Sequence, residues 1–314
     1  MNHVTIDINR IEFAITDACS SQCKHCSVTV VDVKKSKNIN ADAAIHMIKQ
    51  ITTRFSPDSI MTFGGEPLLY AETVCKIHST ARDCGIPDRS IITNGFFSKD
   101  EQKISAVATD ICVSGVSGIL ISVDAFHQEY VPIEPVIHFA AALMKNNIPH
   151  LRVHPAWVIN KDHANRYNEE THRLLKIFNA MGIETSNGNN IFPSDNALKH
   201  LSEYFDPPDN VNLDFRCGER AYTGRLDEVY CIFVNPMGEI KMCGFTLGNI
   251  YHEDISTILE KHNPHSDPIM HTLINGGVKA LVQYAENHGK EVDTIDCYSA
   301  CGVCRKIVRT FSQK

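Results

Sequence analysis

The chain has 314 residues, of which 43% are hydrophobic and 21% charged, and its formal net charge is -7. This length exceeds the usual size of one domain, so we expect one large domain and one smaller domain. The negative balance supplies no general attraction for nucleic acid or an anionic membrane surface, and no apolar run is long enough to cross a bilayer. The first residues lack the apolar middle of a secretory signal. We therefore expect a cytoplasmic protein whose twelve cysteines hold metal rather than form disulfides.

The first two-thirds of the chain alternates short apolar strands with helices. Helices are predicted after the capping residue Asn40, after Ser98 with a less regular pattern, and near 71–84, 136–143 and 166–181. Strands alternating with helices of this length predict right-handed crossovers and a mostly parallel sheet, either open or curled into a barrel. The predicted strands are 11–15, 60–63, 91–93, 119–123, 150–157 and 183–186.

A cluster of Pro, Asp and Asn at 205–210 marks the expected domain boundary, which separates residues 1–205 from residues 206–314. Beyond it the pattern changes to a hairpin of strands 229–234 and 239–242, followed by helices at 254–261 and 268–288. We therefore expect an α/β domain followed by a small α+β domain.

Three cysteines, Cys19, Cys23 and Cys26, lie within eight residues just after the first predicted strand. A loop at the carboxyl end of that strand would present three thiolates. Three ligands leave one iron of a [4Fe-4S] cluster open to another ligand, much as catalytic zinc sites keep a free position. A zinc site short of one ligand and unrelated core cysteines are the alternatives.

This C-x3-C-x2-C motif resembles the radical S-adenosylmethionine (SAM) superfamily, which implies a partial (β/α)6 barrel. In that family the three cysteines hold the cluster, SAM occupies the fourth iron, and one-electron reduction yields a 5′-deoxyadenosyl radical. The residue before the last cysteine is often aromatic and lies by the adenine; here it is His25. The resemblance also implies an electron donor such as a flavodoxin or ferredoxin.

Gly64, Gly65, Glu66 and Pro67 match the GGEP element of the family at the end of the second predicted strand. Glycines let the backbone approach a ligand closely, and Glu66 can balance the ammonium group of SAM. An ordinary strand-to-helix turn is the alternative.

Polar residues also end the third and fourth predicted strands. Asn94 follows the third strand, and Ser122 and Asp124 end the fourth, in segments that resemble family segments near SAM. Ser122 and Asp124 offer acceptors for ribose hydroxyls or partners for the methionyl end, although Asp124 could simply cap a helix. His127, just beyond, could line the mouth of a barrel or pack within its loop.

Arg152 and His154 project to the same face of the fifth predicted strand, because strand side chains alternate. One of them could meet the carboxylate of SAM or the substrate. A buried, hydrogen-bonded histidine is an equal alternative for His154.

The second region holds six cysteines and predicts a second metal centre; they are Cys217, Cys231, Cys243, Cys297, Cys301 and Cys304. The G-x4-C hairpin and the C-x2-C pair resemble auxiliary-cluster domains called SPASM and twitch, which makes Cys243, Cys301 and Cys304 the expected ligands. The fourth could be Cys217 or Cys231. One closed [4Fe-4S] cluster with two spare thiols is the simplest count, two clusters with open sites are the variant, and zinc is the alternative. The remaining cysteines are expected in the core: Cys75, Cys84 and Cys112.

A barrel followed by a short one-cluster domain looks like the peptide epimerases that maturate ribosomally made peptides. In those enzymes a cysteine directly after the hairpin cysteine returns a hydrogen atom, but this chain has Gly244 there, so Cys231 or Cys297 would have to be the donor. We expect hydrogen abstraction from a peptide or amino-acid-derived substrate, leading to epimerisation, oxidation or crosslinking. We expect no leader-binding domain before the first strand, so a partner protein could supply one.

Two other functions stay open at this point. One is twitch-type dehydrogenation of a small alcohol or sugar, which would use the same parts. The other is a non-catalytic iron-sulfur sensor or scaffold, against which the intact cysteine triad and Glu66 argue.

Overall fold

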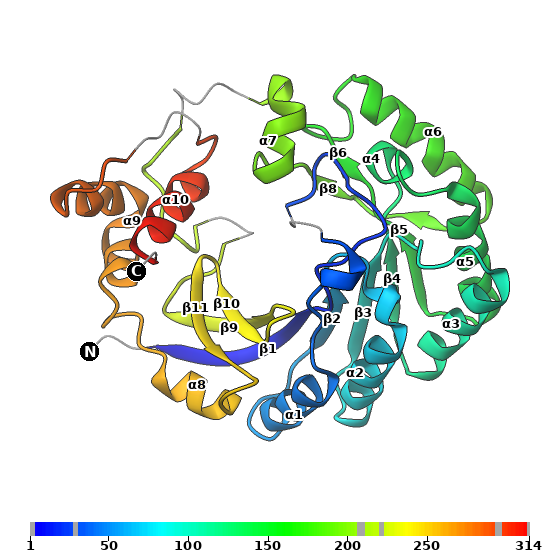
Figure 1. The fold of residues 1–314 in the computed structure, drawn as a ribbon, viewed down its shortest axis with the longest axis horizontal. Helices are drawn as coiled ribbons and strands as arrows, with labels where there is room; N and C mark the ends of the chain where they lie inside the picture. The colour runs from blue at the N-terminus through cyan, green and yellow to red at the C-terminus, as the bar shows by residue number, and fades with distance from the viewer. Residues whose placement is uncertain (1–3, 28–30, 206–210, 220–222, 293–296, 313–314) are drawn as a thin grey trace.

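A computed structural model describes residues 4–27, 31–205, 211–219, 223–292 and 297–312. Its main feature is a nine-stranded sheet in the order β11-β10-β9-β1-β2-β3-β4-β5-β7. The sheet curls into an open arc that carries helices on its outer side (Figure 1). The strands from β1 to β7 pair in parallel, which confirms the predicted parallel sheet and partial barrel. They are β1 (Thr5–Ala14), β2 (Ser59–Phe63), β3 (Asp88–Thr93), β4 (Gly118–Ile121), β5 (His150–Val153) and β7 (Glu184–Thr185).

The predicted crossover helices are all present, including the less regular one after Ser98. Side chains cap several of them at the amino end; the Asn40 amide oxygen accepts a hydrogen bond from the Ala43 amide at 3.0 Å. Their apolar stripes pack on the sheet and form the largest core cluster. The crossover helices are α1 (Ala41–Thr52), α2 (Ala71–Asp83), α3 (Glu101–Val113), α5 (Ile133–Lys145) and α6 (Arg166–Ala180). Three shorter helices lie between them, namely η1 (Val33–Lys35), η2 (Pro67–Tyr70) and α4 (Ala125–Gln128).

The strand predicted at 150–157 is split in two. β5 ends at Val153, and the chain resumes as β6 (Ala156–Trp157), which pairs with β8 (Asn189–Asn190) in a separate small sheet. Pro155 lies at the break, and proline has no amide hydrogen to continue the ladder. The break carries the chain away from the main sheet just beyond its carboxyl edge.

The second region extends the main sheet. β9 (Glu228–Val234) and β10 (Glu239–Met242) form the predicted hairpin, and β11 (Phe245–Asn249) adds a strand that was not predicted. β9 pairs in parallel with β1, so the sheet is continuous between the two regions. The breaker cluster at 206–210 lies outside the described residues.

Helices of the second region cover the end of the sheet. α8 (Ile255–Lys261) and α9 (Pro268–Asn287) lie close to the predicted ranges, whereas α10 (Ala300–Ser312) was not predicted. Two short helices at the end of the first region, α7 (Asp195–Leu201) and η3 (Ser202–Tyr204), were not predicted either. α9 and α10 enclose a second core cluster with Phe215 and Leu226. Cys75, Cys84 and Cys112 pack against the first core, as predicted. Within the described ranges, no helix combines the length and apolar character needed to pass through a membrane.

Candidate active site

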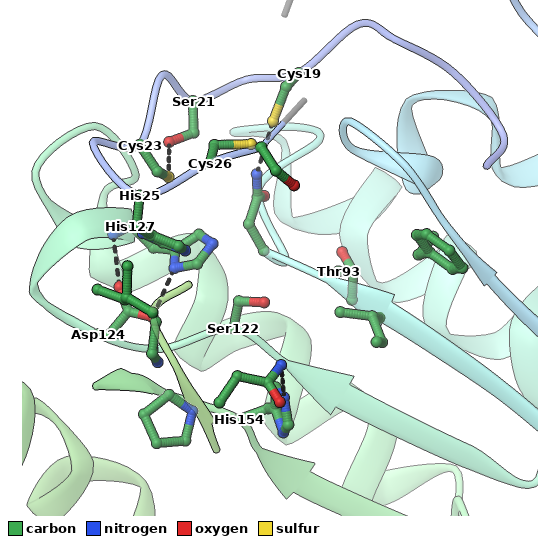
Figure 2. Close-up of a pocket in the computed structure, with 18 of the residues that line it drawn as sticks. Cys19, Ser21, Cys23, His25, Cys26, Thr93, Ser122, Asp124, His127 and His154 are labelled. Carbon is green, nitrogen blue, oxygen red and sulfur yellow. Dashed lines mark hydrogen bonds and ion pairs between the residues drawn. The ribbon is translucent and has the colours of Figure 1, made fainter. Parts of the chain in front are cut away.

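A cavity of about 750 Å³ opens at the carboxyl ends of the parallel strands. The loop after β1 brings Cys19, Cys23 and Cys26 to one side of it, and the ends of β3 and β4 face them (Figure 2). Ligand sites of parallel sheets lie at this edge, because the loops that follow the strands converge there. The other lining residues that the sequence singled out are His25, Gly64, Gly65, Asn94, Ser122, Asp124, His127 and His154.

The two glycines pack the chain against itself as well as lining the cavity. The Gly65 amide donates a hydrogen bond to the Thr16 carbonyl at 2.7 Å, and the Glu66 amide donates to the Ala18 carbonyl at 2.8 Å. A Cβ atom on Gly65 would lie 1.9 Å from the Ala18 carbonyl oxygen. The sequence explained these glycines by close approach of a ligand, but the close approach seen is that of the backbone leading into the cysteine loop.

Glu66 is fully buried and ties three segments together. Its carboxylate accepts hydrogen bonds from the Thr93 hydroxyl at 2.6 Å, the Asn94 amide at 2.8 Å and the Leu68 amide at 2.9 Å. Burial raises the pKa of Glu66 to about 7, although these hydrogen bonds oppose the rise. Glu66 is not among the lining residues, and Pro67 begins η2 behind it. It therefore acts on the cavity through Asn94. The backbone amide of Asn94 binds Glu66, and its side-chain nitrogen Nδ2 lies 3.6 Å from Cys19 Sγ.

Asp124 caps α4 and holds His127. One carboxylate oxygen accepts from the amides of Phe126 at 3.0 Å and His127 at 2.9 Å. The other oxygen is 2.8 Å from His127 Nδ1 and accepts from the Ala156 amide at 3.0 Å. The capping alternative for Asp124 is therefore what the structure shows. Four hydrogen bonds occupy this carboxylate, although the residue still borders the cavity.

The Asp124–His127 pair is charged. Burial opposes ionisation of Asp124, but the charge and hydrogen bond of His127 outweigh it, so the pKa of the carboxyl lies below its ordinary value. Burial likewise opposes protonation of His127, but Asp124 and then Cys23 outweigh it, and the pKa of the imidazole lies well above its ordinary value. The imidazolium of His127, paired with the Asp124 carboxylate, faces the cysteine loop.

His25 is half-buried and packs against the rings of Phe126 and His127. Its ring centroid is 5.1 Å from Phe126 and 5.2 Å from His127, both in edge-on contact. Burial lowers the pKa of His25 to about 4, so the ring is neutral. Its Nδ1 atom has no hydrogen-bond partner within the described part of the chain.

Arg152 lies within β5, whereas His154 follows the end of that strand. His154 borders the cavity; its Nδ1 is 2.7 Å from the Ser186 hydroxyl and its Nε2 is 2.9 Å from the Asn189 amide. Burial lowers its pKa, so both contacts are those of a neutral ring. Arg152 instead lines a hollow near the amino ends of the strands and pairs with Glu184 at 3.3 Å. The structure therefore does not bring Arg152 to the cysteine cavity.

A second cavity, of about 330 Å³, brings four cysteines together: Cys217, Cys243, Cys301 and Cys304. Burial, reinforced by the neighbouring thiols, raises the pKa of Cys217 to about 11 and that of Cys304 to about 12. The other two cysteines of the region do not line this cavity. Cys231 lies on β9 opposite Arg10 of β1, and Cys297 is buried in the second core cluster. Of the two candidates for the fourth ligand, the structure groups Cys217 with the other three.

Neither cysteine set is arranged to hold a single metal ion within the described residues. Within the described residues, no three side chains of His, Cys, Asp or Glu are placed to hold one metal ion. Each thiolate of an iron-sulfur cluster binds a different iron, so its ligands stand further apart than those around one ion. Burial, and next the charge of Glu66, raises the pKa of Cys19 to about 12, so metal binding here must displace a proton.

A family model described as the radical SAM superfamily matches residues 13–199. The chain belongs to the radical SAM superfamily. Membership in this family implies SAM and a [4Fe-4S] cluster as cofactors and agrees with three thiols beside an open cavity. The match runs from β1 into α7 and therefore includes every element that borders the cysteine cavity.

Two curated radical SAM relatives were found by sequence. The probable GTP 3′,8-cyclase of Methanocaldococcus jannaschii is 24% identical over 251 residues, which cover 76% of this chain and 79% of that protein. The GTP 3′,8-cyclase of Moorella thermoacetica is 28% identical over 123 residues, and the match spans 36% of its length. Among solved structures, anSMEcpe with bound AdoMet and Cp18Cys peptide superposes with a TM-score of 0.52 at 14% identity, covering 98% of this chain and 96% of that one. This structural likeness shows the fold alone.

Proposed function

We propose that this radical SAM chain removes a hydrogen atom from a peptide or amino-acid-derived substrate and passes an electron from the resulting substrate radical to an auxiliary cluster. The observation that carries the proposal is the pair of cysteine cavities, with three thiols beside open space in one and four thiols gathered in the other. Phe192 lines both cavities, so one substrate can contact both centres.

The residues of the first cavity have separate roles in this proposal. Cys19, Cys23 and Cys26 hold the [4Fe-4S] cluster and leave one iron for SAM. When bound, cluster and SAM supply a 5′-deoxyadenosyl radical upon one-electron reduction. The positive His127 lies against the cysteine loop and balances the negative charge of bound thiolates. Ser122 and Asn94 present hydroxyl and amide groups at the strand ends, where they can orient SAM.

The second cavity favours oxidation over epimerisation. Four thiolates close a cluster, so no iron is left for the substrate, and the proposed role of this centre is electron transfer. Epimerisation needs a hydrogen donor beside the substrate radical. Neither Cys231 nor Cys297 lines the first cavity. A substrate that loses one hydrogen atom, and then one electron and one proton, has undergone a two-electron oxidation, which can also form a crosslink.

Nucleotide chemistry is the second candidate, because the two curated relatives are named as GTP 3′,8-cyclases. Dehydrogenation of a small alcohol or sugar would use the same residues. Mass spectra of products separate these classes. Loss of two hydrogens or a crosslink in a peptide supports the proposal, whereas turnover of GTP alone, or conversion of an alcohol to a ketone, contradicts it.

SAM cleavage by the anaerobically reconstituted protein tests the enzyme itself. Reduction with dithionite in the presence of SAM should release 5′-deoxyadenosine, and Cys23→Ala should abolish that release. A wild-type protein that holds its clusters and releases none would be a sensor or scaffold instead.

Iron content tests the auxiliary ligands. Cys217→Ala should lose about four irons per chain while part of the SAM cleavage survives. Cys231→Ala is the matched control and should retain its iron. The reverse pattern would assign Cys231 to the cluster and remove Cys217.

A further inference from the structure

Three cavities meet around the segment before α7. Phe192 is shared by the two cysteine cavities, and Arg305 is shared by the four-cysteine cavity and a third cavity of about 460 Å³. Ser194 lines both the first cavity and the third cavity. The Arg305 guanidinium also lies over the Phe192 ring, 5.9 Å from its centroid. The three cavities therefore adjoin one another.

The third cavity, here called the basic cleft, is lined by residues of α7 and α10, which lie near opposite ends of the arc of strands (Figure 1). Its charged lining from α10 is Arg305, Lys306 and Arg309. Positions three or four apart share one face of a helix, so Arg305 and Arg309 point to the same side. Among the described residues, Asp195 is the single acidic side chain of the lining. The cleft is locally positive in a chain of net charge -7.

Two of these cations, Arg305 and Arg309, can meet a ligand. Arg309 is exposed and Arg305 is half-buried. No ion pair joins either one to a carboxylate in the described ranges. A guanidinium offers a planar fork of donors that matches a carboxylate. The volume of the basic cleft is that of a small-ligand site and suits a few residues of extended chain rather than a nucleic-acid duplex.

We propose that the basic cleft binds the carboxylates of an acidic peptide segment, whose neighbouring residue passes Phe192 and enters the first cavity. This inference rests on the proposed function and narrows its substrate to peptides with Asp or Glu close to the modified residue. Arg305 receives the carboxylate nearest the reacting centre, and Arg309 receives one further along the segment. The aromatic ring of Phe192 separates the charged part of the substrate from the site of hydrogen removal.

Binding of a rhodamine-labelled hexaglutamate peptide to the reconstituted full chain, followed by fluorescence anisotropy, tests the inference. Arg309→Glu should weaken binding about three- to tenfold, because it reverses one charge at an exposed position without disturbing the core. Added salt should weaken binding to the wild type further. Arg173→Glu on α6, an exposed position outside the three cavities, is the matched control and should bind like the wild type.

Several outcomes would overturn the inference: no binding of hexaglutamate, equal binding by the Arg309 variant, or equally tight binding of a labelled oligothymidylate. Release of 5′-deoxyadenosine is measured on the same samples without peptide. Normal release with no peptide binding refutes the basic cleft alone. Absent release from the wild type refutes the proposed function instead.

Discussion

Replacing Gly65 with alanine would disrupt its contact with the Thr16–Ala18 backbone, which leads into the cysteine loop. The added Cβ would lie 1.9 Å from the Ala18 carbonyl oxygen and 2.5 Å from its carbon. Ordinary contacts begin near 3.5 Å, so one backbone segment must move by about 1.5 Å. That movement stretches the hydrogen bonds from Gly65 to Thr16 and from Glu66 to Ala18, each worth about 1 kcal/mol net. Together with about 1–3 kcal/mol of overpacking, the expected loss is about 3–5 kcal/mol of unfolding free energy.

Urea unfolding of the metal-free protein measures the loss, and iron content after reconstitution measures the effect on the loop. Gly65→Ala should lower both. Gly118→Ala is the matched control, because a Cβ there meets ordinary contacts no closer than 3.6 Å. Wild-type stability and iron content in the Gly65 variant would show that this backbone contact does not position the three cysteines.

Two further changes test the hydrogen-bonded supports of the fold. The pKa of Glu66 is raised by burial from 4.5 to about 7, so its ionisation destabilises the folded state as pH rises through that window. Relative to Glu66→Gln, the metal-free wild type should therefore lose up to about 3 kcal/mol of unfolding free energy between pH 4.5 and 8; a pH-independent difference would contradict this. Tyr251→Phe removes a hydroxyl that accepts from the Asn40 amide at 2.8 Å and donates to the Pro236 carbonyl at 3.1 Å, and it should cost about 1 kcal/mol in urea unfolding. An unchanged midpoint would show that water replaces both contacts.

The sequence located the first cavity because its signals are local. Cys19, Cys23 and Cys26 are close along the chain, and Asn94 and Asp124 each follow a strand whose end had to lie at the same edge. The contact of Gly65 with the backbone at Ala18 could not be predicted, since the two residues are distant in sequence. The distance of Arg152 from the carboxyl edge of the sheet could not be predicted either. Alternation gives its face of the strand but not how far it lies from the carboxyl edge.

The fourth cysteine of the second cavity depended on tertiary structure. Cys217 lies outside regular secondary structure, and nothing in its spacing distinguishes it from Cys231. The pairing of β9 with β1 separates the two cysteines, because it places Cys231 opposite Arg10 and outside the second cavity. The helix of Cys301 and Cys304 did have a signal. Apolar residues recur along α10 at helical spacing, namely Val303, Ile307, Val308 and Phe311.

The parallel pairing of β9 with β1 bears on how the chain can be divided. β1 has ten residues and is flanked by β2 on one side and β9 on the other. A truncation after residue 205 would uncover a long row of unpaired amide and carbonyl groups, which is a template for aggregation. The same strand leads directly into the cysteine loop. A truncated protein meant to isolate the family-matched portion should therefore keep the hairpin of β9 and β10, or it will expose the strand that carries the loop.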